Sequence, residues 1–277
     1  MYPAVLQLLT CPICSYPLTA TADEKSCRCT GEKSHCFDFS KSGYLNLLCA
    51  QAKEGDSKEA IQARRLFLEA GYYRPLVDQI LGILQQIPSQ SLLDAGCGEG
   101  YYTNQFAVDG RAVLGIDLSK TGVDYAARRA KQLKNRAGFA VASVFQLPVA
   151  DAGIDVITNL FAPCAEEEFS RALKPGGHLL LVGAGEKHLL GLKRTIYEHP
   201  YKNEGRADLP KTMELLDTVH LSYDITLESA EHIQALFSMT PYYWRTSPKD
   251  REKLNGIQTL TTEVEFDIFL FRKGQKL

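Results

Sequence analysis

Short apolar runs alternate with helix-like stretches from residue 91 onward. The apolar runs are SLLDA (91–95), AVLGID (112–117), GFAVA (138–142), IDVITNL (154–160) and HLLLVGAG (178–185). The stretches between them, which include SKTGVDYAARRAKQL and EEEFSRALKPGG, favour helices and turns. This alternation predicts parallel βαβ units in a doubly wound, Rossmann-like α/β sheet. Two later segments, VHLSYDITL (219–227) and TTEVEFDIFLF (261–271), alternate apolar and polar positions and predict an antiparallel end to that sheet.

Two helices are predicted upstream of these strands. Ser57 can cap a helix that runs toward Glu69, and Gly71 can end it. The apolar residues of the second helix recur at helical spacing until Pro88 closes the element: Leu76, Ile80, Leu81 and Leu84. We interpret residues 50–88 as a helical connector. By spacing alone, four of its residues form a solvated or packing face: Arg64, Arg65, Tyr72 and Tyr73.

Composition predicts one large domain joined to a small module. The chain has 277 residues, of which 45% are apolar and 23% are charged, the balance of a globular protein. No run approaches the roughly 18 consecutive apolar residues of a membrane span, and the N-terminus lacks a secretory signal, so a cytoplasmic location is expected. The net charge of −2 indicates no global attraction to nucleic acid, although a local patch would be enough.

The cysteines are unevenly spread, with six of the eight in the first 50 residues. Cys11 and Cys14 form a CxxC knuckle. Four later residues compete to complete a metal site: Cys27, Cys29, His35 and Cys36. Without an export signal, clustered thiols favour a metal over disulfides. Four sulfur and nitrogen ligands close a zinc site, so the zinc is expected to be structural and to stabilise a module, residues 1–49, that is too small to bury much core.

A glycine-rich turn opens the domain predicted at residues 89–277. Asp94 ends its first strand, the turn follows at Gly96, Gly98 and Gly100, and Asp117 ends the second strand. Because glycine has no side chain, the backbone of such a turn can closely approach a ligand that binds at the carboxyl ends of the strands. The GxGxG spacing differs from the GxGxxG fingerprint of dinucleotide-binding proteins. The glycine turn contains no basic residue that could bind a phosphate, and Asp117 could accept hydrogen bonds from both ribose hydroxyls. These features favour S-adenosylmethionine as cofactor, with a loop at 146–148 over its adenine.

The fourth strand ends in TNLFAPC, where the methyl acceptor is expected. Asn159, Phe161 and Pro163 are the candidates for positioning the acceptor, with Asn159 on its polar edge. The sequence shows no general base that could activate Cys164 as a nucleophile, so we interpret it as a packing thiol.

Two other segments have the composition of RNA contacts. The stretch at 120–136 carries six basic residues, for which a solvated face is the default interpretation and phosphate contact the alternative: Lys120, Arg128, Arg129, Lys131, Lys134 and Arg136. The segment MTPYYWRTSP groups three aromatic residues beside Arg245, which suits an unstacked base as well as core packing.

Taken in order, these motifs resemble one family, the bacterial 23S rRNA (guanine-N1) methyltransferases. The resemblance covers nearly the whole chain and rests on CPIC, HCFDFSKSGYLNLL, GDSKEAIQARRLFLEAGYYRPL, LLDAGCGEGYYT, FAPC, LKPGG and MTPYYW. It implies a zinc module that recognises RNA, a Rossmann-like class I methyltransferase domain, and a homodimer. It also implies that the acceptor is a guanine in a hairpin of domain II of 23S rRNA.

The resemblance implies residue roles as well. The zinc ligands would be Cys11, Cys14, Cys29 and His35, although the family usually has a cysteine three residues before the histidine. The cofactor residues would be Tyr73, Gly98, Glu99 and His188, beside Asp94, Gly96 and Asp117 of the general fold. Two alternatives stay open: a methyltransferase that acts on a small molecule or a protein, and a non-catalytic RNA-binding factor that retains the fold.

Overall fold

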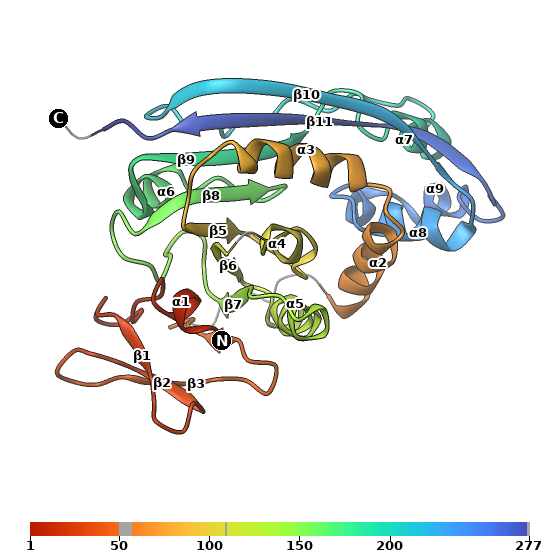
Figure 1. Ribbon diagram of the computed structural model, residues 1–277. Coiled ribbons are helices and arrows are strands. Elements are labelled where there is room, and N and C mark those ends of the chain that lie inside the picture. Colours follow the sequence, from red (N-terminus) through yellow and green to blue (C-terminus); the bar gives the residue numbers. More distant parts are fainter. Residues whose placement is uncertain (50–56, 109, 276–277) are drawn as a thin grey trace.

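The five apolar runs predicted as strands lie in the middle of one large sheet in the computed structural model of the chain (Figure 1). The structure describes residues 1–49, 57–108 and 110–275, so residues 50–56 of the predicted connector lie outside it. Within the described residues the strand order is β10-β11-β9-β8-β5-β6-β7-β4. Neighbouring strands from β4 to β9 are parallel, whereas β11 and β10 are antiparallel. The prediction of a Rossmann-like sheet with an antiparallel end is therefore confirmed.

The strands of this sheet are β4 (Leu45–Asn46), β5 (Ser91–Ala95), β6 (Ala112–Asp117), β7 (Gly138–Val141), β8 (Ile154–Leu160), β9 (Leu173–Ala184), β10 (Glu214–Leu227) and β11 (Leu260–Arg272). The helices around it are α2 (Lys58–Glu69), α3 (Arg74–Gln85), α4 (Tyr101–Phe106), α5 (Lys120–Leu133), α6 (Glu166–Ala172), α7 (Leu190–Ile196), α8 (Ala230–Ser238) and α9 (Pro248–Glu252), with a short 3-10 helix η1 (Tyr243–Arg245).

Two strands begin earlier than the pattern predicts. β9 starts at Leu173, because residues 173–177 stay extended beside the start of β8, with a shift in register after Ile154. β10 starts at Glu214, which pairs with Arg272 of β11. The pattern places LKPGG in a turn, since proline and glycine usually interrupt strands. Pairing with neighbouring strands overrides that local preference here.

Helices cover both faces of the sheet. Successive residues of a strand point to opposite faces, and Leu92 of β5 packs with α3 while Leu93 packs with α6. The predicted helix from Ser57 is confirmed, since the Ser57 hydroxyl accepts the Ala60 N–H at its start. The apolar positions predicted on α3 face the core, with Ile80 fully buried. Among the described residues, no helix is long and apolar enough to span a membrane.

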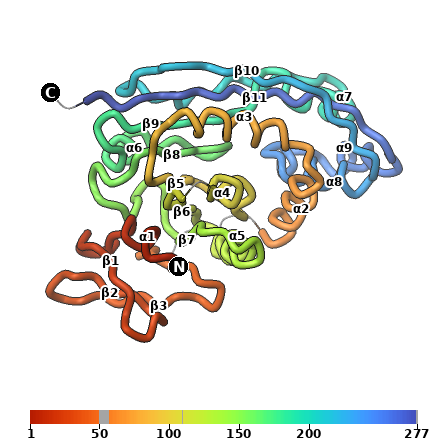
Figure 2. The backbone as a smooth tube through the Cα atoms, viewed as in Figure 1, coloured from red at the N-terminus to blue at the C-terminus, as the bar shows by residue number. Residues whose placement is uncertain are grey.

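The N-terminal module forms its own small sheet beside β7 (Figure 2). It contains α1 (Pro3–Leu6) and an antiparallel sheet of β1 (Leu18–Ala20), β2 (Ser26–Cys29) and β3 (Cys36–Asp38). The chain then joins the large sheet, because Leu45 and Asn46 of β4 pair in parallel with β7. Apolar residues of module and domain share one core cluster, in which Leu9 and Phe169 are fully buried. The module is thus docked firmly onto the domain.

Candidate functional site

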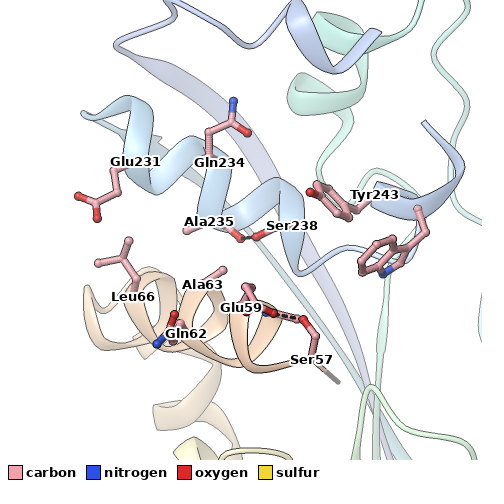
Figure 3. Close-up of a pocket in the computed structure, with 12 residues that line it drawn as sticks. Ser57, Glu59, Gln62, Ala63, Leu66, Glu231, Gln234, Ala235, Ser238 and Tyr243 are labelled. Atoms are coloured by element: carbon pink, nitrogen blue, oxygen red, sulfur yellow. Dashed lines mark hydrogen bonds between the residues drawn. The ribbon is translucent and has the colours of Figure 1, made fainter. Parts of the chain in front are cut away.

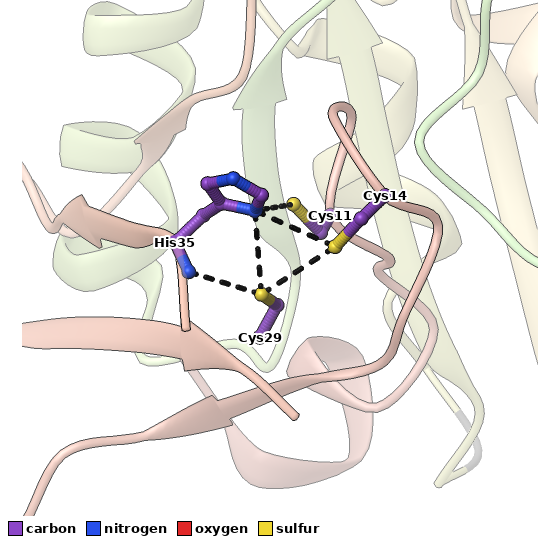
Figure 4. Close-up of side chains that lie close together, drawn as sticks. All are labelled: Cys11, Cys14, Cys29 and His35. Atoms are coloured by element: carbon purple, nitrogen blue, oxygen red, sulfur yellow. Dashed lines mark hydrogen bonds between the residues drawn. The ribbon is translucent and has the colours of Figure 1, made fainter. Parts of the chain in front are cut away.

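Four side chains of the N-terminal module converge on one point (Figure 4). Their ligand atoms lie within 4.8 Å of one another: Cys11 Sγ, Cys14 Sγ, Cys29 Sγ and His35 Nδ1. The imidazole Nδ1 is 3.5, 3.4 and 3.6 Å from the three sulfurs in turn. In a tetrahedral zinc site, ligand bonds of about 2.0–2.3 Å place the ligand atoms about 3.5–3.8 Å apart. The donor set and its spacing therefore fit Zn²⁺.

Local backbone pairing brings these ligands together. The Ser15 N–H donates to the Cys11 carbonyl at 2.8 Å and closes the knuckle. On the other side, Cys29 ends β2 and His35 precedes β3. The Cys29 N–H donates to the His35 carbonyl at 3.0 Å, and the His35 N–H donates to the Cys29 sulfur at 3.1 Å. The hairpin thus compensates for the unusual spacing between these two residues.

The structure does not bring Cys27 or Cys36 into this cluster. Cys27 is buried with its sulfur 3.6 Å from the Phe37 carbonyl, and burial raises the pKa of its thiol to about 12. Cys36 is exposed. Burial alone would raise the pKa of Cys29, but hydrogen bonds from the Gly31 backbone, Cys14 and His35 lower it to about 7. Since zinc binds the thiolate, Cys29 is the better suited of the competing thiols.

The glycine turn lies between β5 and α4, at the carboxyl ends of the parallel strands. Gly96 adopts φ +86°, and a Cβ there would lie 2.5 Å from the Ala162 Cβ. The Gly98 N–H donates to Asp117 Oδ2 at 2.9 Å, so the carboxylate at the end of β6 also shapes the turn. Glycine is required here both for the left-handed backbone and for the close approach of the next strand end.

Asp94 is buried beneath this turn and makes two hydrogen bonds. The Thr103 hydroxyl donates to its Oδ2 at 2.5 Å, and the Thr158 hydroxyl donates to its Oδ1 at 2.9 Å. Burial raises the pKa of Asp94 to about 6, although the two hydroxyls oppose the rise. At neutral pH the group is ionised, which gives the turn a fixed negative charge.

Helix α2 lies over the glycine turn and contributes a basic partner. Arg64 Nη1 is 3.2 Å from Glu99 Oε2, and the Glu99 side chain is only 5% exposed. Burial raises the pKa of Glu99, while the nearby Arg64 opposes that rise. The spacing of α2 places Arg64 on a solvated or packing face. The structure shows that it forms an ion pair next to the predicted cofactor residues.

Tyr73 and His188 meet although they are far apart in sequence. The His188 Nδ1 accepts the Glu265 N–H at 3.2 Å, and its Nε2 lies 3.3 Å from the Tyr73 hydroxyl. Burial lowers the pKa of His188 to about 3, so the ring is neutral. Because Nδ1 accepts, the proton is on Nε2 and is donated to the tyrosine oxygen. The two residues that only the resemblance singles out therefore form one uncharged pair, in which Tyr73 is buried and His188 is partly buried.

The acceptor-side residues have different surroundings. Asn159 is fully buried, and its Nδ2 donates to the Ala95 and Pro163 carbonyls at 2.9 and 3.2 Å. Phe161 adopts φ +54° and is 46% exposed. Burial raises the pKa of Cys164 to about 11, in keeping with a packing thiol. Asn159 thus holds the strand end together, whereas Phe161 is exposed at the surface next to it.

One segment that contacts the predicted site residues has no signal in the sequence pattern. The segment between α7 and β10, residues 197–213, contains no helix or strand, yet its side chains reach both halves of the site. Asn203 donates to the His188 carbonyl at 2.9 Å, and Arg206 donates to Asn159 Oδ1 at 2.6 Å. Single polar residues in a polar stretch have no periodicity, so only the tertiary structure reveals these contacts.

A shallow groove lies outside this site, between α2 and α8 (Figure 3). Ala63 and Leu66 of α2 and Ala235 of α8 line the groove, and Tyr243 and Trp244 line it as well. Within the MTPYYW segment, Tyr242 is buried in the core, whereas Trp244 is 71% exposed. The groove contains none of the predicted cofactor residues.

The fold and the two clusters define a class: a Rossmann-like, S-adenosylmethionine-dependent methyltransferase with a structural zinc module. A family model described as "Methyltransferase domain" matches residues 92–177, and the zinc-ribbon model "RlmA, N-terminal" matches residues 9–57. The crystal structure of YcgJ from Bacillus subtilis superposes with a TM-score of 0.51 at 15% identity, covering 72% of this chain and 98% of YcgJ. That likeness shows the fold.

Two curated relatives match almost end to end. YxjB of Bacillus subtilis (strain 168), whose name assigns it provisionally to the 23S rRNA (guanine-N1)-methyltransferases, is 34% identical over 96% of this chain and 97% of its own. The 23S rRNA (guanine(748)-N(1))-methyltransferase of Streptomyces fradiae is 30% identical over 95% and 97%. The chain belongs to the 23S rRNA (guanine-N1)-methyltransferase family.

Proposed function

We propose that this protein transfers a methyl group from S-adenosylmethionine to N1 of a guanine in a hairpin of 23S rRNA. One observation carries the proposal: a single chain, which matches its relatives almost end to end, contains both a closed Cys₃His cluster and a glycine turn that directly follows an acidic strand end. The cluster would hold zinc through Cys11, Cys14, Cys29 and His35. This zinc is structural, because four protein ligands leave no open position.

The cofactor would be held by residues on both sides of the glycine turn: Tyr73, Asp94, Gly96, Gly98, Glu99, Asp117 and His188. When bound there, S-adenosylmethionine supplies a methyl group activated by a sulfonium. Asp117 suits the ribose hydroxyls, and the loop at 146–148 suits the adenine. The neutral Tyr73–His188 pair adds hydrogen-bonding capacity without a competing charge, since burial keeps the imidazole unprotonated.

The acceptor would enter at the end of β8. Guanine N1 is paired in a duplex, so the base must come from a loop or be flipped out of the stack. The Phe161 ring is exposed there and lies edge-on to Phe266, with ring centroids 5.7 Å apart. An exposed ring on a fixed turn is a stacking platform for such a base. Asn159 and Pro163 act indirectly in this proposal, by fixing the turn. Alignment of the base with the methyl group supplies much of the rate.

RNA binding is divided between the zinc module and α5 in this proposal. The module has four basic and four acidic residues, so its net charge is zero: Lys25, Arg28, Lys33 and Lys41 against Asp23, Glu24, Glu32 and Asp38. The stretch 120–136 has six basic residues and one acidic residue, Asp124. The Ser42 hydroxyl donates to Asp124 at 2.5 Å, so module and helix are adjacent. The module would read RNA shape, and α5 would contact phosphates.

The domain division follows from these roles. We propose that residues 1–49 recognise RNA, that residues 50–88 contribute Tyr73 to the cofactor site, and that residues 89–277 form the methyltransferase domain. We also propose a cytoplasmic location, because the proposed substrate is rRNA, and a homodimer, which the family resemblance implies. Light scattering of the purified protein measures the oligomeric state, and a monomeric mass would contradict that part of the proposal.

The test of function is direct methyl transfer. The protein is incubated with labelled S-adenosylmethionine and 23S rRNA, and the modified nucleotide is mapped by the arrest of primer extension. We expect label at N1 of one guanine, and none when that guanine is replaced by adenine. Label on a low-molecular-weight acceptor in RNase-treated extract would favour the small-molecule alternative. Binding of the hairpin without turnover would favour the non-catalytic alternative.

A further inference from the structure

The segment 197–213 crosses the ends of β8 and β9, and one of its side chains points inward. The Arg206 side chain is only 8% exposed, although its neighbours in the segment are mostly at the surface. We propose that Arg206 is a positioning residue for methyl transfer, which clamps the acceptor-side turn, residues 159–164, against the cofactor turn. The proposal rests on the proposed function for its catalytic consequence, whereas the clamp itself can be tested without the RNA.

The Arg206 guanidinium bonds to two strand ends and the turn between them. It donates to Asn159 Oδ1 at 2.6 Å, to the Ala162 carbonyl at 2.7 Å and to the Val182 carbonyl at 3.0 Å. Its Nε donates to Asp208 Oδ1 at 2.7 Å. A planar guanidinium can serve several acceptors in fixed directions, which a lysine ammonium cannot reproduce.

Asp208 extends the clamp to the far end of the turn. Its Oδ2 accepts the Cys164 N–H at 2.7 Å, while its Oδ1 bonds to Arg206. Arg206 and Asp208 therefore hold the Ala162 carbonyl and the Cys164 N–H, which lie two residues apart in the FAPC turn. Because one partner is charged in each of these bonds, they are stronger than bonds between neutral groups.

Asn159 transmits this restraint to the cofactor turn. Its Oδ1 accepts from Arg206, so its Nδ2 is oriented toward the Ala95 and Pro163 carbonyls. Ala95 is the last residue of β5 and directly precedes Gly96. A Cβ at Gly96 would lie 2.5 Å from the Ala162 Cβ, so the two turns are already in close contact. Arg206 thus fixes the acceptor side relative to the cofactor side through both contacts.

Phe161 shows why such a restraint is needed. Its φ of +54° is in the left-handed region, which is unfavourable for a residue with a side chain. The strained peptide is retained because the Phe161 N–H donates to the Val182 carbonyl at 3.0 Å and Arg206 holds the next carbonyl. Without the clamp, the turn is expected to relax and to move the exposed ring away from the acceptor position.

The chain offers a matched control in Arg171. This arginine makes the same kind of contact elsewhere: it donates to the Leu147 and Val149 carbonyls at 3.0 and 2.8 Å and pairs with Glu168 at 2.8 Å. It therefore clamps the loop that follows β7, on the proposed adenine side. Substitution of Arg206 is therefore expected to affect kcat, because this residue orients the acceptor-side turn. Substitution of Arg171 is expected to affect cofactor binding, because this residue orients the loop after β7.

The first experiment measures the clamp by hydrogen–deuterium exchange of the full-length protein. In Arg206→Met, amides of residues 160–164 should exchange at least tenfold faster, while peptides from α3 and the zinc module stay unchanged. Arg206→Lys should be intermediate, and Arg171→Met should leave this peptide unaffected. If Arg206→Met does not fold, Asp208→Asn replaces it, with the Cys164 amide as the reporter. Unchanged exchange in the turn would overturn the clamp whether or not the protein methylates RNA.

The second experiment measures the consequence for methyl transfer. Arg206→Met should lower kcat on 23S rRNA about 100-fold, because a misplacement of about 1 Å can have this effect, with binding of S-adenosylhomocysteine within threefold of wild type. Arg171→Met should weaken S-adenosylhomocysteine binding and leave kcat within threefold. Equal losses of kcat and cofactor binding in Arg206→Met would overturn the positioning role. Absence of transfer by the wild type would instead contradict the proposed function, and the exchange result would still decide the clamp.

Discussion

The zinc module has only short helices and strands, and the acceptor-side segment 197–213 has none, but the two are held in place in different ways. The module is held together by four zinc-ligand side chains, all of which lie between Cys11 and His35 in one short stretch of sequence. The acceptor-side segment is held by single residues such as Arg206, whose partner Asn159 is 47 residues away. A site whose residues are close together in the sequence can therefore be predicted from the sequence. A site whose residues are far apart in the sequence is recognised only once the fold is known.

Among the variants that test this difference, removal of a zinc ligand is expected to have the largest effect on folding. In Cys29→Ser, the module should lose its metal and unfold, because the apparent binding energy of about 10–16 kcal/mol at such sites is also folding free energy. Zinc content per chain and amide exchange in residues 11–38 measure the outcome. The matched control is Cys36→Ser, since Cys36 is exposed and outside the cluster. A full equivalent of zinc in Cys29→Ser would show that Cys27 or Cys36 can replace this ligand.

The sequence predicts the central fold well because its signals are local. The bounds of β6 and β8 agree with the predicted runs 112–117 and 154–160, since buried parallel strands are continuous apolar segments. The zinc ligands implied by the family resemblance also converge in space. β4 is not predicted, because two residues carry no periodicity. Arg64 and Arg206 are not predicted as site residues, since their partners Glu99 and Asn159 become neighbours only after folding.

The Arg64–Glu99 pair provides the next largest expected effect. In Arg64→Met, the nearly buried Glu99 carboxylate loses its partner, and the free energy of unfolding should fall by about 2 kcal/mol, less than for a fully buried pair because Arg64 is 23% exposed. Binding of S-adenosylhomocysteine should weaken as well, since Arg64 also lies next to Gly98. Urea denaturation and calorimetry measure these two quantities.

The control for that prediction is the exposed pair Arg74–Asp78, whose side chains are 54% and 56% exposed. Arg74→Met should change the free energy of unfolding by less than about 0.5 kcal/mol, because solvent screens such pairs. Equal losses in the two variants would contradict a special role for Arg64 at the cofactor turn.

The partly buried His188 predicts a smaller, pH-dependent effect. The unfolded chain binds a proton at this residue below about pH 6.5, whereas the folded pKa is about 3. Protonation therefore favours the unfolded state, and the contribution of His188 to stability is lost as pH falls from about 6.5 toward 3. Between pH 7.5 and 5.5, wild type should lose about 1 kcal/mol more of its free energy of unfolding than His188→Gln does. Parallel losses in the two proteins, measured by urea titration, would show that the ring is protonated in the folded state.

The smallest expected effect concerns the charge difference between the zinc module and α5. In the double variant Lys134→Asn and Arg136→Gln, both residues are exposed, and asparagine tolerates the left-handed φ of +54° at position 134. These residues follow the end of α5 and belong to the basic stretch 120–136. If this stretch contacts phosphates through them, the dependence of log Kd on log salt should become shallower by about 1.4–1.8. Affinity for the 23S rRNA hairpin should fall several-fold at physiological salt, with zinc content unchanged. The control Lys58→Gln and Lys249→Gln removes the same charge from exposed sites on α2 and α9 and should leave the slope as it is. Both double variants carry the same net charge of −4, since each removes two positive charges from a chain of net charge −2, so a difference between them cannot come from net charge. An unchanged slope in the Lys134→Asn and Arg136→Gln variant would contradict phosphate contact by these two residues.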